Sequence, residues 1–350
     1  MEIYVYSPKV ELLGVIDGYS SLRWRRRFYE PGEFELHCAS TPENLALLSA
    51  GNILHRLDRR EAGVIEGIVI EADSLSSEKV TVTGRFGSAL LCQRIITPTI
   101  HYSGTVEGGM RKIVLDNAIT RPIGNFTLGE ELGDDSVCTF QVTGKNIQNT
   151  LSSLAKASGL GYLVRLDVPN QQWVFEVYKG IDKSVTQSNF PYVLFNGEFG
   201  NITGPKYTYN EQSYRNYAYV AGQGEGDTSF IVEVDQTNGE SLRELWVDAN
   251  DLQRTEDQSD EDYCAQLTQR GKEKLAEMTC FENFEADAVD TANFEYMVDW
   301  NLGDIVSFER WNLLLNQRIT EVEEVYENGV VTITPVCGTS LPETLVLEDG

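Results

Sequence analysis

Carboxylates are the residues of this 350-residue chain that could most readily do chemistry. The chain has 54 Asp and Glu residues against 28 Lys and Arg, and its formal net charge is −26. Two carboxyl groups about 5–9 Å apart can hydrolyse a glycosidic bond. Sequence context sets no such pair apart, and the acid-rich stretches 256–262 and 321–327 are typical of solvated faces. A peptidoglycan-degrading enzyme is therefore an alternative function without named catalytic residues.

Other patterns that mark catalytic or ligand sites are missing from the sequence. It has no Gly-x-Ser-x-Gly elbow, no Asp-x-Asp-x-Asp-Gly calcium loop and no Cys-x-x-Cys pair among its six cysteines. Its three histidines do not have zinc-ligand spacing. The glycine run 222–226 leads into a predicted strand and has acidic neighbours, which argues against a phosphate site. We expect no catalytic residue, no metal site and no cofactor.

The negative charge is concentrated in the second part of the chain. Residues 1–200 carry 19 Lys and Arg against 23 Asp and Glu, a net of −4, whereas residues 201–350 carry 9 against 31, a net of −22. A field of this sign repels phosphate backbones and disfavours nucleic-acid binding. One part of the protein is expected to present an acidic face, and the alternative is that the charge only keeps the protein soluble.

The scaffold that must position these residues is mainly β with an α+β insertion. Residues 1–100 predict a small antiparallel, barrel-like β unit with a hairpin turn at Pro31-Gly32. Thr41 is the predicted N-cap of a short helix that begins at Pro42 and ends near Leu48. The predicted strands are 2–6, 11–16, 21–29, 33–38, 51–57, 63–71 and 78–84.

Residues 101–190 predict an α+β domain inserted between two β units. Apolar residues recur at helical spacing in 105–119 and 145–158, and Gly159 follows the second helix as its C-cap. Strands 160–166 and 172–178 complete this domain.

Residues 191–350 predict a second barrel-like β unit with one long helix near 259–278. Ser259 can cap that helix, and the acidic residues 260–262 suit its first turn. Its apolar stripe is expected to pack against a sheet and consists of Cys264, Leu267, Gly271, Leu275 and Met278. The predicted strands are 192–196, 216–222, 229–235, 244–247, 284–289, 304–309, 317–325 and 330–336.

Two distant stretches share a pattern that indicates an internal duplication. The segment 51–54 matches 303–306 at an offset of 252, Ile65 matches Ile319 at 254, and Val82 matches Ile333 at 251. Chance similarity between two amphipathic hairpins is the alternative explanation. A chain with two similar barrels can form a trimer whose ring has six similar positions, which can mate with a six-fold tube on one side and a three-fold object on the other.

A basic run interleaved with an aromatic residue stands out near the N-terminus. In a strand, Arg23, Arg25 and Arg27 share one face, whereas Trp24 and Arg26 point to the other. We expect the three arginines to make an intersubunit contact with the acidic half of another copy. A solvated strand face is the simpler alternative.

Segments in order along nearly the whole chain resemble the siphophage tail-tip hub proteins of the ReqiPepy6 type. The resemblance rests on the segments 19–24, 31–36, 63–66, 84–96, 104–107, 216–222, 243–249, 270–271, 302–306 and 318–322. It also extends to the N-terminal hub regions of tail-associated lysins and to contractile-tail hub proteins.

This resemblance implies a structural protein of the virion, assembled in the host cytoplasm and placed in the baseplate at the tail tip. Two β-barrel tube-type domains per subunit are expected to form a pseudo-six-fold ring in a homotrimer. The implied partners are a hexameric distal tail protein, the tape-measure protein and receptor-binding or tail fibre proteins. Phage DNA is expected to pass through a carboxylate-lined bore without specific binding.

The resemblance also bears on the alternatives. Larger relatives append a wall hydrolase or a carbohydrate-binding domain. The dozen or so residues after Gly338 are too few for either domain. A glycan-binding module would need an exposed aromatic platform, for which the candidates are Trp173, Trp246, Trp300 and Trp311. No membrane insertion is expected, because no apolar run approaches the roughly 20 residues that cross a bilayer.

Overall fold

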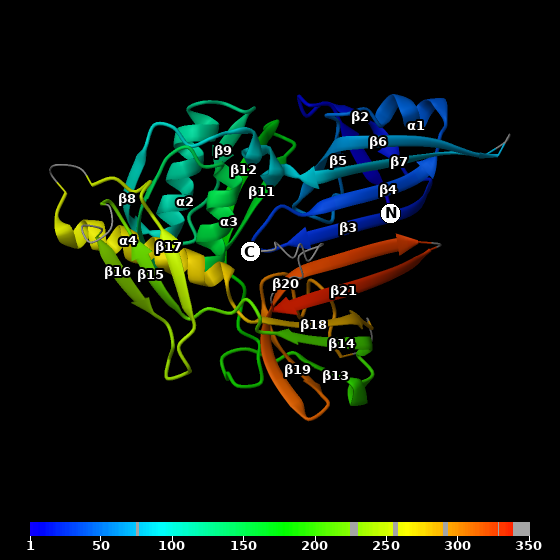
Figure 1. Cartoon of the computed structure of the whole chain (residues 1–350). Helices are drawn as coiled ribbons and strands as arrows, with labels where there is room; N and C mark the ends of the chain where they lie inside the picture. Colours follow the sequence, from blue (N-terminus) through cyan, green and yellow to red (C-terminus); the bar gives the residue numbers. More distant parts are fainter. Residues whose placement is uncertain (75–76, 225–229, 255–257, 290–292, 328, 339–350) are drawn as a thin grey trace.

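The computed structural model in Figure 1 describes residues 1–74, 77–224, 230–254, 258–289, 293–327 and 329–338. The described chain is mainly β, as predicted, with its α-helices distributed between residues 42 and 277. Parts of two segments discussed above, the glycine run 222–226 and the acid-rich stretch 256–262, lie outside the described residues. No helix within the described ranges is long and apolar enough to cross a membrane.

The first β unit contains seven strands and one short helix around its own buried core. Alternation puts Leu22 and Trp24 into this core, where Trp24 packs against Phe34 and Phe86. The Thr41 hydroxyl accepts a hydrogen bond from the Asn44 N–H and so caps the helix as predicted. The elements are β1 (Ile3–Tyr6), β2 (Leu12–Ile16), β3 (Tyr19–Arg27), β4 (Glu33–Ala39), α1 (Pro42–Leu47), β5 (Ile53–His55), β6 (Ala62–Ser74) and β7 (Ser77–Phe86).

The middle of the chain forms an α+β layer with a second core. Gly159 ends the longer helix in the left-handed conformation, with φ of 74°, as predicted for a C-cap. A short helical segment, η1, links this layer to β7. The elements are η1 (Gly87–Gln93), β8 (Ile100–Thr105), α2 (Val106–Val114), η2 (Leu115–Ile119), β9 (Phe126–Leu128), β10 (Val137–Val142), α3 (Ile147–Ser158), β11 (Gly161–Asp167) and β12 (Gln172–Tyr178).

The second β unit returns after residue 190 and has a third core, which includes Trp300, Phe308 and Val322. Its strands are separated in sequence by residues 211–280, which contain three other strands and the long helix. The elements are β13 (Leu194–Asn196), η3 (Gly197–Phe199), β14 (Ile202–Asn210), β18 (Phe281–Ala288), β19 (Ile305–Arg310), β20 (Leu313–Glu327) and β21 (Val330–Gly338).

The long helix and three strands form a fourth, separate core that sequence reasoning did not set apart. The helix α4 (Asp260–Glu277) begins after Ser259, whose hydroxyl accepts a hydrogen bond from the Asp262 N–H. It packs on the three-stranded sheet β16-β15-β17, where Gly271 lies against Val220 and Val234. These strands are β15 (Tyr217–Ala221), β16 (Ile231–Asp235) and β17 (Glu244–Asp248).

The two β units are joined edge to edge into one sheet, which corrects the expectation of two closed barrels. The strand order is β14-β18-β21-β20-β3-β4-β7-β6-β5-β1-β2, and β13 and β19 branch from β20. Within the described residues no pairing closes either unit on itself. The reason is the length of β20: its first half pairs with β19, and its second half projects beyond β19 and takes β3 of the other unit as its neighbour (Figure 1).

Strand pairing supports the internal duplication residue by residue. The pair Ile53↔Val64 corresponds to Ile305↔Arg318, which gives offsets of 252 (305 − 53) and 254 (318 − 64). The β6–β7 and β20–β21 hairpins have a register shift at the same place, after Ile65 and after Ile319. For β7 and β21 the offset is 253, since Val80 corresponds to Ile333. The predicted match of Val82 with Ile333 was therefore two residues out of register.

Candidate functional site

The basic run of β3 lies against an acidic stretch of β20 in the seam, defined here as the paired residues 21–27 of β3 and 321–327 of β20. Arg25 lies opposite Glu323, and Trp24 lies opposite Glu324. Because successive side chains in a strand point to opposite faces, the seam has an open polar face and a buried face. The charges on the two faces are organised differently.

The open face carries a ladder of ion pairs across three strands. Arg25 Nη2 lies 2.8 Å from Glu323, and Arg27 Nε lies 2.9 Å from Glu321. Both guanidinium groups also contact Glu33 on β4, at 2.8 and 3.0 Å. Arg23 lies 3.1 Å from Glu323. The ladder therefore connects β4, β3 and β20.

The acidic partner expected for these arginines is thus present within the same chain. Arg25 and Arg27 have side chains 20% exposed and are occupied by Glu33, Glu321 and Glu323. The Arg23 side chain is 48% exposed, so of the three arginines it has the most room for a further contact. An intersubunit role for the three arginines stays a prediction.

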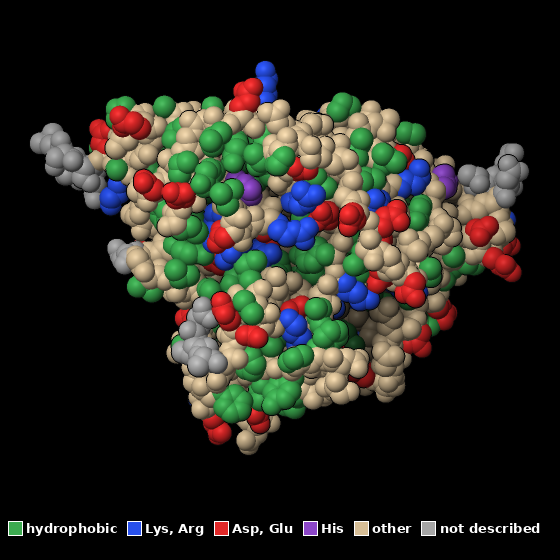
Figure 2. Space-filling model, turned by 180° about the vertical axis from the view of Figure 1, so that it is seen from behind, with side chains coloured by type: hydrophobic (Ala, Val, Ile, Leu, Met, Phe, Trp, Pro, Cys, Tyr) green, Lys and Arg blue, Asp and Glu red, His purple; other side chains and the backbone are tan. Residues whose placement is uncertain are grey.

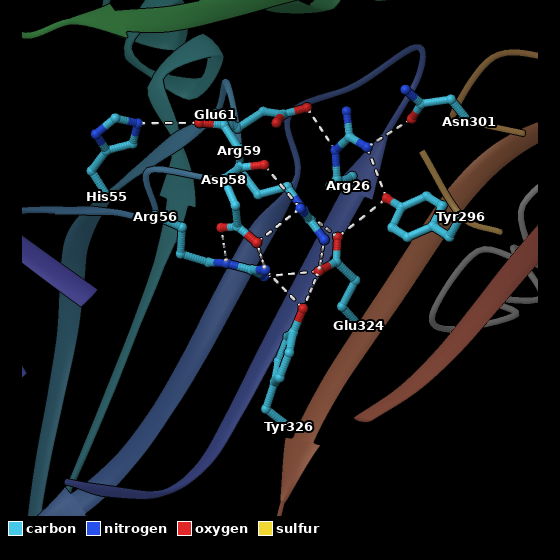
Figure 3. A network of polar contacts seen from close by, with 10 residues as sticks. All are labelled: Arg26, His55, Arg56, Asp58, Arg59, Glu61, Tyr296, Asn301, Glu324 and Tyr326. Atoms are coloured by element: carbon cyan, nitrogen blue, oxygen red, sulfur yellow. Dashed lines mark hydrogen bonds and ion pairs between the residues drawn. The ribbon is translucent and has the colours of Figure 1, made fainter. Parts of the chain in front are cut away.

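Glu324 is the centre of the buried face, and Figure 3 shows how its neighbours converge on it. Its side chain is fully buried and accepts five hydrogen bonds. Arg59 donates two, at 2.8 and 2.7 Å, and Arg56 donates one at 2.8 Å. The hydroxyls of Tyr296 and Tyr326 donate the other two, at 3.1 and 2.6 Å. Glu324 thereby ties β20 to the loop after β5.

A second buried pair lies within the first unit, and its arginine is linked to the second unit. Arg26 Nε donates to Glu61 at 2.8 Å, and both side chains are more than nine-tenths buried. The same guanidinium donates to the Tyr296 hydroxyl at 2.8 Å and to Asn301 at 3.0 Å. Arg56 also stacks over the Trp24 and Tyr326 rings, at 5.5 and 4.7 Å to the centroids. The network joins residues 56–61 of the first unit to residues 296–326 of the second.

The charge state of Glu324 follows from these contacts. Burial alone would raise the pKa of its carboxyl, but the hydrogen bonds and charges of Arg59 and Arg56 outweigh burial and hold the pKa at about 2. On the open face, burial raises the pKa of Glu321 despite the nearby Arg27 and Arg25. Glu324 is therefore ionised at neutral pH, and its carboxylate is occupied by arginines rather than free to act as a base.

Sequence reasoning found the open face of the seam and missed the buried one. Arg23, Arg25 and Arg27 were recognised from their alternation, whereas Arg56, Arg59 and Glu324 were not. A signal was available: Glu324 occupies a position in register with Val322, where an apolar residue is expected. A carboxylate at such a position requires a buried cation nearby.

Two further carboxylates, Glu273 and Glu277, line a cavity of about 320 Å³ between α3 and α4. Burial raises the pKa of Glu273 in this cavity. Its neighbour Glu277 is paired with Lys274 at 2.7 Å. Among the described residues, no group of three or more His, Cys, Asp or Glu side chains is arranged to hold a metal ion.

The four candidate tryptophans do not form one platform. Trp300 is buried in the second-unit core, and Trp173 is nearly buried at the wall of a cavity of about 490 Å³. Trp246 and Trp311 are exposed, on β17 and at the turn between β19 and β20. On the face seen in Figure 2, Lys and Arg side chains lie among Asp and Glu rather than in one continuous basic patch.

Comparison with known proteins identifies the fold as that of phage tail proteins. The tail protein of prophage MuSo2 from Shewanella oneidensis has a TM-score of 0.62 at 13% identity, covering 97% of this chain and 98% of its own. A tail protein from Neisseria meningitidis has a TM-score of 0.59 at 13% identity, covering 96% and 95% of the two chains. Prophage tail protein gp18 from Listeria monocytogenes has a TM-score of 0.57 at 12% identity, covering 96% and 94%.

Sequence comparison gives the family. No match was found among curated protein sequences. A family model described as siphovirus ReqiPepy6 Gp37-like protein matches residues 2–339, almost the entire chain. The chain therefore belongs to the siphovirus ReqiPepy6 Gp37-like family of phage tail proteins.

Proposed function

We propose that this protein is the structural baseplate hub at the distal end of a phage tail and acts as a homotrimer. The observation that carries the proposal is the duplication inside one continuous sheet: each chain contains two β units with the same strand pairing. Three chains then supply six similar units. Such a ring is suited to join a six-fold tail tube or distal tail ring to a three-fold tip.

The seam supports this role because it fixes the two units of a chain relative to each other. Seven residue pairs join β3 to β20. On the buried side, Glu324 of the second unit holds Arg56 and Arg59 of the first, and Arg26 of the first donates to Tyr296 and Asn301 of the second. A buried charge that loses its partner costs several kcal/mol, about 3–5 for a broken pair, so the network penalises any hinge motion at the seam. A load-transmitting ring needs such rigid joints.

In the proposed ring, the open polar face of the sheet lines the DNA exit channel. On this face the second unit carries Glu321, Glu323 and Glu285, which fits the acidic bore expected from the sequence. Arg25 and Arg27 lie on the same face and are paired with these carboxylates. Paired guanidinium groups have less capacity to hold phosphates, so DNA would pass without specific binding.

The remaining parts of the chain are proposed to contact neighbouring tail proteins. We divide the chain into a first hub domain (1–100), an inserted α+β domain (101–190) and a second hub domain (191–350) that includes α4. The inserted domain and the α4 unit stand outside the continuous sheet (Figure 1). They leave the ring free to stack on a distal tail hexamer and the tape-measure protein, and they offer surfaces for receptor-binding or fibre proteins.

The mass of the purified protein in solution tests the proposal directly. Native mass spectrometry or light scattering over a range of concentrations should give three chains, alone or after addition of the distal tail ring protein. Electron microscopy of the trimer should then show a ring with six similar lobes. A chain that stays monomeric at every concentration, with and without that partner, would overturn the hub.

One observation favours a second candidate, a wall-degrading activity: Glu273 has a raised pKa in a cavity beside Glu277. Glu277 is occupied by Lys274, which counts against a working pair. The discriminating assay is release of muropeptides from purified peptidoglycan by the native protein and by Glu273→Gln. Turnover that disappears in the variant would establish the enzyme.

A further inference from the structure

The duplication extends to two further strands, which sequence comparison did not reveal. In the first unit β4 pairs with β7 and β3 pairs with β4, with Phe34↔Gly84 and Trp24↔Phe34. In the second unit β18 pairs with β21 and β14 pairs with β18 in the same way, with Phe284↔Cys337 and Tyr207↔Phe284. Trp24 thus corresponds to Tyr207 (207 − 24 = 183) and Phe34 to Phe284 (284 − 34 = 250). The repeated unit is β3-β4-β7-β6-β5, matched by β14-β18-β21-β20-β19.

The two copies of the repeat differ in what covers one edge. The outer edge of β20 is covered by β3 of the same chain. Its counterpart is the outer edge of β6 beyond residue 66, where β7 is the single strand partner among the described residues. Likewise β3 is paired on both sides, whereas its counterpart β14 pairs only with β18 in the described part of the chain. Each chain therefore has one complete junction between the two copies of the repeat, where β20 pairs with β3. The strands that would form a second junction, β14 and β6, lie at opposite ends of the eight strands from β14 to β6.

Side chains at the open edges are exposed where their counterparts are buried. Val322 and Glu324 on β20 are completely buried, but the corresponding Ile68 and Ile70 on β6 are 38% and 55% exposed. Their positions follow from the offset of 254 between β6 and β20 (322 − 68 and 324 − 70). Exposed isoleucines on an unpaired strand edge favour pairing with another strand.

The edge of β14 presents exposed side chains that can pair with those at the edge of β6. Its Tyr209 corresponds to Arg26 by the offset of 183 and is 52% exposed, whereas Arg26 is 5% exposed. Lys206 is exposed on the same strand and corresponds to Arg23. An apolar ring and a cation are thus presented by a strand that lacks a neighbour on that side in the described residues.

We infer that residues 67–72 of β6 in one copy pair antiparallel with residues 205–210 of β14 in the next copy. The register is transferred from the seam: Val322↔Arg26 gives Ile68↔Tyr209, and Glu323↔Arg25 gives Val69↔Thr208. By the same transfer Glu71 lies opposite Lys206 of the neighbouring copy. The partner is therefore a second copy of this chain, held by backbone hydrogen bonds of the kind that join the seam.

The two kinds of junction use different chemistry on their buried faces. The seam inside the chain buries an ionic network around Glu324. The intersubunit junction would bury Ile68, Ile70 and Tyr209 and would place the opposite charges of Glu71 and Lys206 across the strands. An apolar junction can form between folded chains without first desolvating several charges, which suits a contact made during assembly.

This inference rests on the proposed trimer and specifies how it closes. The contact joins two different surfaces, so repetition gives a head-to-tail ring rather than a two-fold dimer. In a trimer, three seams alternate with three intersubunit junctions. The open sheet of the single chain then becomes continuous around the ring.

Cysteine cross-linking tests the register. In a background in which the partly exposed Cys92, Cys264 and Cys280 are replaced by Ser, the double variant Val69→Cys/Thr208→Cys should yield covalent trimers on oxidation or with a short thiol cross-linker. Cβ atoms of directly opposed residues lie about 4.5–5.5 Å apart, within reach of both treatments. Mixing the two single variants should give covalent dimers. Ile231 on β16 is 47% exposed, close to the 52% of Val69. The control Ile231→Cys/Thr208→Cys should therefore give no covalent trimer.

Charge exchange tests the pairing without cross-links. Glu71→Lys and Lys206→Glu should each weaken the trimer about fivefold. The double variant Glu71→Lys/Lys206→Glu should restore it, and Glu43→Lys on the exposed surface of α1 should have no effect. Ile70→Asp should abolish the trimer at micromolar concentration with an unchanged circular dichroism spectrum, because Ile70 is already half-exposed in the single chain.

The outcomes separate this inference from the hub itself. Covalent trimers together with rescue by charge exchange would support the inferred junction. A native trimer that neither cross-links at Val69 and Thr208 nor responds to Ile70→Asp would overturn this junction and leave the hub standing. A native protein that never trimerises, even with the distal tail ring protein, would overturn both.

Discussion

Glu324→Gln is expected to loosen the seam far more than its modest size change suggests. The native carboxylate accepts five hydrogen bonds, three of them from Arg56 and Arg59. The neutral amide removes the buried one of the two carboxylates that contact Arg56 and Arg59, and leaves these nearly inaccessible guanidinium groups with only the half-exposed Asp58. The new NH₂ group also points a donor at partners that are themselves donors.

The size of the effect can be worked out in two ways. Lowering the pKa of Glu324 from 4.5 to about 2 corresponds to about 3 kcal/mol of preferential stabilisation of the charged form. Removing one member of a buried ion pair costs about 3–5 kcal/mol in comparable proteins. We therefore expect the free energy of opening the seam to fall by about 3 kcal/mol or more.

Hydrogen–deuterium exchange is the appropriate assay, because it reports opening of the seam separately from global unfolding. Peptides covering residues 19–27 and 317–327 should exchange about 150-fold faster in Glu324→Gln, the equivalent of about 3 kcal/mol. The matched control is Glu327→Gln, the same change on an exposed side chain three residues along β20. An increase in exchange of less than threefold in Glu324→Gln would refute the view that this carboxylate holds the two units together.

Three further perturbations follow from the same structure. Acid should weaken the seam, because folding lowers the pKa of Glu324. The stability that this carboxyl contributes is complete above its unfolded pKa near 4.5 and is lost as the pH falls towards 2. The thermal midpoint of the native protein should therefore drop over this pH range, and the thermal midpoint of Glu324→Gln should drop less. Arg23→Glu breaks a half-exposed pair worth about 0–1 kcal/mol within the chain, so the thermal midpoint should change little. The same variant tests the intersubunit role predicted for Arg23 from the sequence: a weaker trimer in sedimentation experiments would support that role, and an unchanged trimer affinity would contradict it. Gly271→Ala puts a methyl group 2.6 Å from a Val234 methyl. This overpacking should destabilise the α4 unit by about 1–3 kcal/mol in denaturant titrations. The control Gly124→Ala should be near neutral, because Gly124 has open space around it.

Local features of the fold were predictable because their physical causes are local. The caps at Thr41 and Ser259 and the left-handed Gly159 are each recognised from a few adjacent residues, and all three are present as predicted. The duplicated hairpins were also visible, because β6–β7 and β20–β21 are each continuous in sequence and keep nearly constant offsets.

The other half of the duplication was hidden by insertions. β3 and β14 differ by an offset of 183, whereas β4 and β18 differ by 250, because β15, β16, β17 and α4 are inserted between β14 and β18. Without a constant spacing, two short strands of different composition show no pattern. Their correspondence becomes visible only through their partners in the sheet.

The sequence by itself determined the β class, the helix ends, the hairpin repeat and the family of this protein. Tertiary structure alone decided that Glu324 is a fully buried anion and that Arg25 finds its carboxylate in the same chain, 298 residues away. It also decided that the sheet does not close on itself within the described residues. The physical reason is that backbone hydrogen bonds are the same for every strand: which edge pairs with which depends on the lengths and positions of distant segments, and local sequence carries little information about either.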